Sequence, residues 1–190
     1  MTYNQFYNDI LTAHALHPRH ANPGATPGLP LNPGVTPDFG QTRELLPGLD
    51  DDTRREKVNP GTTPGFEQQA AAEQVLTQIG VNASCGDRLQ FWVSVDEDKV
   101  IKQITFAGEG CMISRASADI AAEILTGQKV AGAQTLIANF VAMIRGAASE
   151  AQMATLGEAV ALADIQNSPA RVKCATLAWH TLEQILTGVI

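Results

Sequence analysis

The chain has 190 residues, 44% of them hydrophobic, which is enough for one domain with a sizeable core. It has 13 Lys and Arg residues against 20 Asp and Glu, a formal charge of −7, which argues against a nucleic-acid partner. No stretch approaches the roughly 18 consecutive apolar residues of a membrane helix, and the opening "MTYNQFYNDI" resembles no export signal. We therefore expect a cytoplasmic protein with reduced thiols and no membrane partner.

The first part of the chain combines a helical pattern with a long segment rich in proline and glycine. Aromatic and apolar residues at helical spacing predict a helix over residues 3–17, which Pro18 ends. Nine of the ten prolines lie between residues 18 and 64, where "NPGATPG", "NPGVTPD" and "NPGTTPG" repeat a turn-forming motif. We interpret residues 20–65 as an irregular surface insertion within a single domain of residues 1–190, with a partner-docking loop as the alternative.

The second part of the chain has regular patterns that predict strands first and helices afterwards. Strands are expected at residues 75–81, 88–95 and 100–108, the last two joined as a hairpin by "DEDK". Helices are expected at residues 112–126, 133–146, 150–164 and 169–187, with Pro169 suited to the first turn of the last helix. This order predicts an α+β fold, with a small antiparallel sheet and helices packed on one of its faces.

Each of the three cysteines lies at the boundary of a predicted element, so their thiols can meet at one edge of the sheet. Cys85 lies between two strands, Cys111 opens a helix, and Cys174 lies in the first turns of the last helix. Zinc takes four ligands, chiefly sulfur and nitrogen, and accepts a carboxylate oxygen, for which Asp87 is the nearest candidate. Three ordinary core cysteines remain the alternative, because no CxxC pair sharpens the pattern.

The four histidines add no clear ligand to this set. His14, His17 and His20 flank the insertion, and a metal site at His14 and His20 is a weaker alternative to ordinary boundary histidines. His180 follows Cys174 by six residues, which places it on another face of the same helix.

Three motifs, "NASCGD", "GEGCMIS" and "PARVKCATLAWH", resemble the cysteine motifs of the SufU-type branch of the IscU/NifU family of iron–sulfur cluster assembly proteins. The first helix and "HPRH" are also similar to that family, whereas the Pro/Gly-rich insertion has no counterpart in it. IscU scaffolds have a histidine immediately before the third cysteine, where this chain has Lys173. The 63 positions between Cys111 and Cys174 also resemble SufU rather than IscU proteins.

The resemblance implies a SufE/NifU-like fold, and a zinc ion bound by Cys85, Asp87, Cys111 and Cys174. It also implies a sulfurtransferase-type role, in which Cys85 accepts persulfide sulfur from a SufS-type cysteine desulfurase and passes it to downstream iron–sulfur assembly proteins. The glycine-flexible loop around Cys85 favours the same residue as the nucleophile. The alternatives are a scaffold for a transient [2Fe–2S] cluster or iron, and a structural zinc module without transfer activity.

Overall fold

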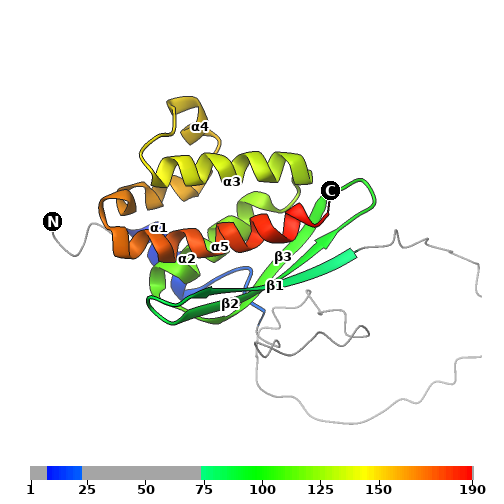
Figure 1. Cartoon of the computed structure of the whole chain (residues 1–190), viewed down its shortest axis with the longest axis horizontal. Helices are drawn as coiled ribbons and strands as arrows, with labels where there is room; N and C mark the ends of the chain where they lie inside the picture. The colour runs from blue at the N-terminus through cyan, green and yellow to red at the C-terminus, as the bar shows by residue number, and fades with distance from the viewer. Residues whose placement is uncertain (1–7, 23–73, 190) are drawn as a thin grey trace, which may run out of the picture. The chain divides into compact units, whose positions relative to one another are not determined.

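A three-stranded antiparallel sheet, in the order β1-β2-β3, forms one layer of the computed structural model, which describes residues 8–22 and 74–189. Helices lie on one face of this sheet, with α5 against β1 and β2 and α2 against β3 (Figure 1). This architecture confirms the predicted α+β fold. In chain order the elements are α1 (Asp9–Leu16), β1 (Gln74–Asn82), β2 (Asp87–Val95), β3 (Ile101–Glu109), α2 (Met112–Leu125), α3 (Val130–Ile144), α4 (Glu150–Ala154), the 3₁₀ helix η2 (Gly157–Asn167) and α5 (Pro169–Thr187).

The sheet brings the ends of its strands together at the turn between β1 and β2. Asn82 pairs with Asp87 across that turn, and Arg88 pairs with Glu109 at the end of β3. Gly108 has a φ of 135°, and a Cβ atom there would collide with the backbone of Arg88, so β3 needs a glycine at this close approach. The first residues of β2 and the entry to α2 are neighbours as a result.

Helix α5 is held in the core by its tryptophan, which determines where this helix meets the sheet. Trp179 is fully buried, and its ring stacks on Phe140 of α3 with the ring centroids 3.9 Å apart. Its Nε1 donates a hydrogen bond to Ser117 Oγ of α2 at 3.0 Å, and Ser117 Oγ donates to the carbonyl of Ala175 at 2.6 Å. A buried tryptophan of this kind is worth about 3 to 5 kcal/mol relative to alanine. Contacts with α3 through Phe140 and with α2 through Ser117 therefore fix the part of α5 that carries Cys174.

One predicted helix is wrong in type. Residues 150–164 were expected to form a single α-helix, but α4 ends at Ala154, and the 3₁₀ helix η2 follows. Ser149 and Gln152 form a reciprocal capping box that starts α4. Gly157, with a φ of 49°, then interrupts the α-helical path. Apolar spacing alone does not separate these two helix types, because Leu162 and Ile165 are buried in either case.

Two predicted boundaries also change near the N-terminus. Helix α1 begins at Asp9, after Asn8, whose side chain accepts a hydrogen bond from the amide of Leu11 at 3.0 Å. Residues 20–22 are not part of an irregular excursion, because Ala21 bridges Phe106 in parallel and the His20 carbonyl accepts the Phe106 amide at 3.0 Å. The rest of the predicted insertion, residues 23–65, lies outside the described residues. No helix in the described ranges is long and apolar enough to cross a membrane.

Candidate metal centre

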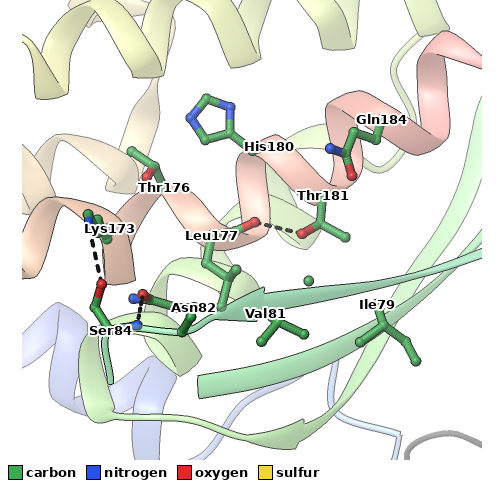
Figure 2. Close-up of a pocket in the computed structure, with 12 residues that line it drawn as sticks. Ile79, Val81, Asn82, Ser84, Lys173, Thr176, Leu177, His180, Thr181 and Gln184 are labelled. Carbon is green, nitrogen blue, oxygen red and sulfur yellow. Dashed lines mark hydrogen bonds between the residues drawn. The ribbon is translucent and has the colours of Figure 1, made fainter. Parts of the chain in front are cut away.

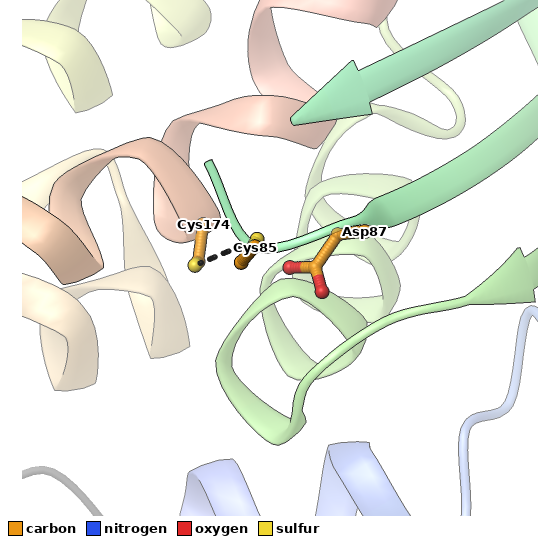
Figure 3. A group of neighbouring side chains, drawn as sticks. All are labelled: Cys85, Asp87 and Cys174. Atoms are coloured by element: carbon orange, nitrogen blue, oxygen red, sulfur yellow. Dashed lines mark hydrogen bonds between the residues drawn. The ribbon is translucent and has the colours of Figure 1, made fainter. Parts of the chain in front are cut away.

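The four residues predicted to bind zinc come from four places in the fold that meet at one end of the sheet. Cys85 lies in the β1–β2 turn, Asp87 is the first residue of β2, Cys111 is the N-cap of α2, and Cys174 lies near the start of α5. Figure 3 shows the side chains of Cys85, Asp87 and Cys174 near one another. Their ligand atoms all lie within 4.8 Å of one another.

The distance between two of the sulfur atoms suits a tetrahedral metal site. The Sγ atoms of Cys85 and Cys174 are 3.7 Å apart. Two sulfurs that each lie about 2.3 Å from a zinc ion in a tetrahedron are about 3.8 Å apart. The observed separation is therefore close to the one that two zinc-bound sulfurs would have, and it is too large for a disulfide.

Asp87 places a buried carboxylate oxygen at this site. Its side chain is 5% exposed, and Oδ1 accepts the backbone amide of Cys111 at 3.0 Å. Oδ2 is buried, and no donor among the described residues meets hydrogen-bond distance and angle for it. Burial on its own would raise the pKa of Asp87, but the nearby Cys85, Ser114 and Cys111 donors together hold it below its ordinary value. A buried, ionised and unsatisfied oxygen fits a cation.

The two remaining cysteines differ from Cys85 in exposure. Cys85 is exposed, Cys111 is intermediate and Cys174 is buried. Burial raises the pKa of the Cys174 thiol, and the neighbouring sulfurs of Cys111 and Cys85 raise it further. A thiolate at Cys174 would therefore need a cation beside it to be stabilised.

Cys111 is next to this group but is not one of the three closest residues. Its Sγ accepts a hydrogen bond from the amide of Ser114 at 3.5 Å, as the cap of α2. Its backbone amide donates to Asp87 Oδ1 at 3.0 Å, so Cys111 lies beside the group. The described structure thus brings three of the four predicted residues together and places the fourth beside them.

The NifU-like N terminal domain model matches residues 58–180, which include all four of these residues. The chain belongs to this family. The IscU iron–sulfur cluster assembly scaffold protein of Thermotoga maritima is 41% identical over 117 residues, 62% of this chain and 80% of that protein. The zinc-dependent sulfurtransferase SufU of Bacillus subtilis is 36% identical over 103 residues, 54% of this chain and 69% of that protein.

Solved structures agree with the NifU-like assignment at the level of the fold. FiSufU, a SUF-system protein from Fervidobacterium islandicum AW-1, has a TM-score of 0.65 over 97% of this chain and 99% of its own, at 22% identity. This similarity supports the α+β architecture and nothing more specific.

Asn82 is a residue of the NifU-like site that the sequence analysis missed. Its carbonyl accepts the amides of Cys85 and Gly86 at 3.2 and 2.9 Å, and its Oδ1 accepts the amide of Ser84 at 3.1 Å. Its Nδ2 donates toward the Cys174 sulfur at 3.6 Å. Asn82 therefore shapes the turn that carries Cys85 and also contacts a second predicted ligand. Asparagine is favoured in such turns, which was the only signal available in the sequence.

Lys173, which replaces the histidine of IscU scaffolds, faces the turn of Cys85 and not a ligand position. Its Nζ donates a hydrogen bond to Ser84 Oγ at 3.1 Å. An ammonium group cannot bind a metal, so this contact leaves the ligand set unchanged. It ties the start of α5 to the residue before Cys85.

The N-terminal histidines of the NifU-like domain have separate partners. His14 is 5% exposed, and its Nδ1 and Nε2 each lie 2.7 Å from a carboxylate oxygen, of Asp119 and Glu158 respectively. The ring of His20 instead lies 3.3 Å from the Ile104 carbonyl oxygen. The proposed pairing of His14 with His20 is not what the described residues show.

A cleft of about 530 Å³ extends from this site between β1 and α5. Figure 2 shows residues of β1 on one side and one face of α5 on the other. The cleft reaches Asn82 and Ser84, so it opens beside the turn of Cys85.

Proposed function

We propose that this chain is a zinc-dependent acceptor of persulfide sulfur, which it takes from a SufS-type cysteine desulfurase and relays into iron–sulfur cluster assembly. The observation that carries the proposal is an exposed thiol, Cys85, whose sulfur is 3.7 Å from the buried sulfur of Cys174 and near Asp87, whose Oδ2 is buried without a hydrogen-bond partner. The name of the B. subtilis relative, zinc-dependent sulfurtransferase SufU, supports the same role.

Cys85 is the acceptor in this proposal because it is the exposed cysteine and lies in a turn. Its thiolate attacks the terminal sulfur of the desulfurase persulfide, forming a new S–S bond while the S–S bond of the donor breaks. The donor cysteine leaves as a thiolate, so sulfur moves without net oxidation or reduction. Gly86 has a φ of 80°, with open space around it, and allows the turn to move.

Zinc would be held by Cys85, Asp87, Cys111 and Cys174, and would keep their thiols deprotonated near neutral pH. Asp87 contributes Oδ2 while its Oδ1 stays on the Cys111 amide. Cys174 is buried on a helix that the core fixes, so it serves as an anchor. The Asn82 amide donates to the Cys174 sulfur and stabilises its negative charge.

The second candidate function is a scaffold that assembles and transfers a [2Fe–2S] cluster. The T. maritima relative named as an IscU scaffold favours it, at 41% identity. Clusters are held mainly by thiolates, however, and the described site offers three cysteines with an aspartate. A third candidate, a structural zinc module without transfer activity, would use the same three cysteines and Asp87 as ligands.

Two measurements on the full chain test the proposal. Protein purified without added metal should contain about one zinc per chain. After incubation with a SufS-type desulfurase and cysteine, alkylation and peptide mass analysis should find one extra sulfur on the peptide with Cys85.

Other outcomes select among the candidates. Iron with acid-labile sulfide in place of zinc would favour the scaffold. Extra sulfur on Cys111 or Cys174 would support the sulfur relay but would show that this cysteine, and not Cys85, is the nucleophile. If no cysteine gains sulfur while the desulfurase turns over, the relay is contradicted and the structural zinc module is favoured.

A further inference from the structure

The turn that carries Cys85 has an exposed tip. Residues 83–86 are all exposed, whereas Asn82, the last residue of β1, is 6% exposed. The amides of Cys85 and Gly86 donate hydrogen bonds to the Asn82 carbonyl. The amide of Ser84 donates to Asn82 Oδ1 at 3.1 Å. The backbone of the tip is therefore held in shape by bonds to Asn82, which require no other element of the fold.

Two contacts of the described residues join this tip to helix α5. The Sγ atoms of Cys85 and Cys174 lie 3.7 Å apart, and Lys173 Nζ donates a hydrogen bond to Ser84 Oγ at 3.1 Å. Figure 2 shows Lys173 reaching from α5 to Ser84. Ser84 precedes Cys85 in the chain, and Lys173 precedes Cys174. The lysine contact is therefore next to the sulfur pair and joins the same two segments.

The two segments joined by this contact have different surroundings. Helix α5 is packed in the core, where Trp179 stacks on Phe140. The tip is exposed, and at its end Gly86 has a φ of 80° with no atom within 4 Å of the place that a Cβ would take. A glycine in open space sets little steric limit on the backbone around it. The Lys173 hydrogen bond thus ties an exposed segment to a helix that the core holds.

The chemistry of this contact suits a bond that forms and breaks. Both side chains are exposed and line the cleft between β1 and α5, so water competes for each of them. The Lys173 ammonium has three donors on a flexible stem, and it finds another acceptor readily when Ser84 moves away. A hydrogen bond of this kind shifts an equilibrium severalfold without locking it.

We propose that Lys173 is a positioning residue for the sulfur relay. Through its hydrogen bond to Ser84 it holds Cys85 at the metal position beside Cys174, and release of this bond lets the Cys85 sulfur leave that position to react. The inference rests on the proposed function and adds to it a residue that binds neither the metal nor the transferred sulfur.

Two substitutions remove the hydrogen bond from opposite sides. Lys173→Met keeps a long side chain without a donor, and Ser84→Ala removes the acceptor without changing any charge. Alkylation of Cys85 by iodoacetamide is followed by peptide mass in the full chain supplied with zinc. Each variant should react roughly threefold to tenfold faster than the parent, because Cys85 leaves the metal position more often. The double variant should react no faster than the single ones, because both remove the same contact.

A second measurement is independent of the metal. Nitrogen-15 relaxation of the labelled chain as purified reports the order of the amides of residues 84–86. In both variants the order parameters should fall toward the values below about 0.6 that mark flexible backbone. Lys173→Arg keeps a donor and should restore the parent's order and alkylation rate. Lys129→Met, at an exposed position before α3, is the matched control and should behave as the parent does.

The proposal is overturned if Ser84→Ala leaves the alkylation rate of the zinc-bound chain unchanged, since the charge of Lys173 and not its hydrogen bond would then matter. It is also overturned if the effects of the two substitutions multiply in the double variant, or if the order of residues 84–86 is the same in both variants as in the parent. A chain that binds no zinc contradicts the proposed function instead. Metal analysis recognises that case, and the order parameters then still test the role of Lys173.

Discussion

At the residue scale, the site combines one exposed thiol with one buried thiol. Cys85 lies on an exposed turn whose shape depends on hydrogen bonds to Asn82. Cys174 is buried on α5, next to Ala175, whose carbonyl accepts the Ser117 hydroxyl. Exposure is what a sulfur acceptor needs, and burial is what a metal anchor needs. In the proposed relay, the acceptor and anchor roles therefore fall on different cysteines because one is exposed and the other is buried.

Asp87 gives the sharpest residue-scale prediction. In the variant Asp87→Asn the shape is kept, but the ionised oxygen that lacks a partner is replaced. We expect zinc affinity to fall by at least about tenfold, the lower end of the effect of losing even an indirect partner of a metal ligand. Competition with a chromophoric chelator measures it. Asp164→Asn, at an exposed position on η2, is the matched control and should bind zinc as the parent does. Equal affinity in both variants would remove Asp87 from the ligand set.

At the element scale, the cluster around His14 connects three helices. The imidazole on α1 lies between Asp119 of α2, which is fully buried, and Glu158 of η2, which is exposed. Asp119 also accepts the backbone amide of His20 at 2.7 Å. Both ring nitrogens face carboxylates, an arrangement that suits the protonated ring. Burial alone would lower the pKa of His14, but hydrogen bonds and charge attraction from Asp119 and Glu158 raise it above its ordinary value.

The sign of the pH effect follows from this raised pKa. The stabilisation is complete below about pH 6.5, the ordinary value for histidine, and is lost as pH rises through the higher pKa of the folded state. His14→Gln should lower the free energy of unfolding by about 3 kcal/mol at pH 6, where a buried charge loses its partner, and by less at pH 9. Urea unfolding at both pH values measures this. The exposed His17 provides the control His17→Gln. A His14→Gln effect that is constant with pH would contradict the charged pair.

The sequence predicts an element correctly where its residue pattern is compatible with only one type of secondary structure. Alternating residues in "RLQFWVSV" correspond to β2, whose Leu89, Phe91 and Val93 are fully buried. The 3₁₀ helix η2 could not be predicted, because its buried residues are also compatible with an α-helix and the break depends on backbone angles at Gly157. The cysteines could be placed at element ends, but the contact of Asn82 Nδ2 with the Cys174 sulfur depends on how α5 packs on the sheet. Zinc binding at the four predicted residues stays a prediction.

At the scale of the whole molecule, the structure describes residues 8–22 and 74–189. These two ranges contain all the described helices and strands, and the second contains the four predicted zinc ligands. The Pro/Gly-rich segment separates the first of these ranges from the second. Residues 20–22 nevertheless belong with the sheet, because they hydrogen-bond to Phe106 of β3. These three residues of the predicted insertion thus pack on β3, and the rest of its predicted range up to residue 65 lies outside the described residues.

Two deletions test this boundary and the single-domain interpretation together. Replacing residues 24–65 with a short Gly/Ser linker should change the melting temperature by less than about 3 °C, the equivalent of about 1 kcal/mol. Replacing residues 20–65 removes three hydrogen bonds of backbone amides: the Phe106 amide to the His20 carbonyl at 3.0 Å, the Asn22 amide to the Phe106 carbonyl at 2.8 Å, and the His20 amide to Asp119. At about 1 kcal/mol for each hydrogen bond, this longer deletion should melt several degrees lower.

Differential scanning calorimetry and zinc content are measured on both deletion proteins. The shorter deletion should keep the parent's zinc content, because all four predicted ligands lie outside it. A large loss of stability in the shorter deletion would mean that the Pro/Gly-rich segment packs as part of the core. Equal melting temperatures for the two deletions would mean that the contacts of residues 20–22 with β3 contribute nothing to stability, and the insertion would then begin at residue 20, as its composition indicates.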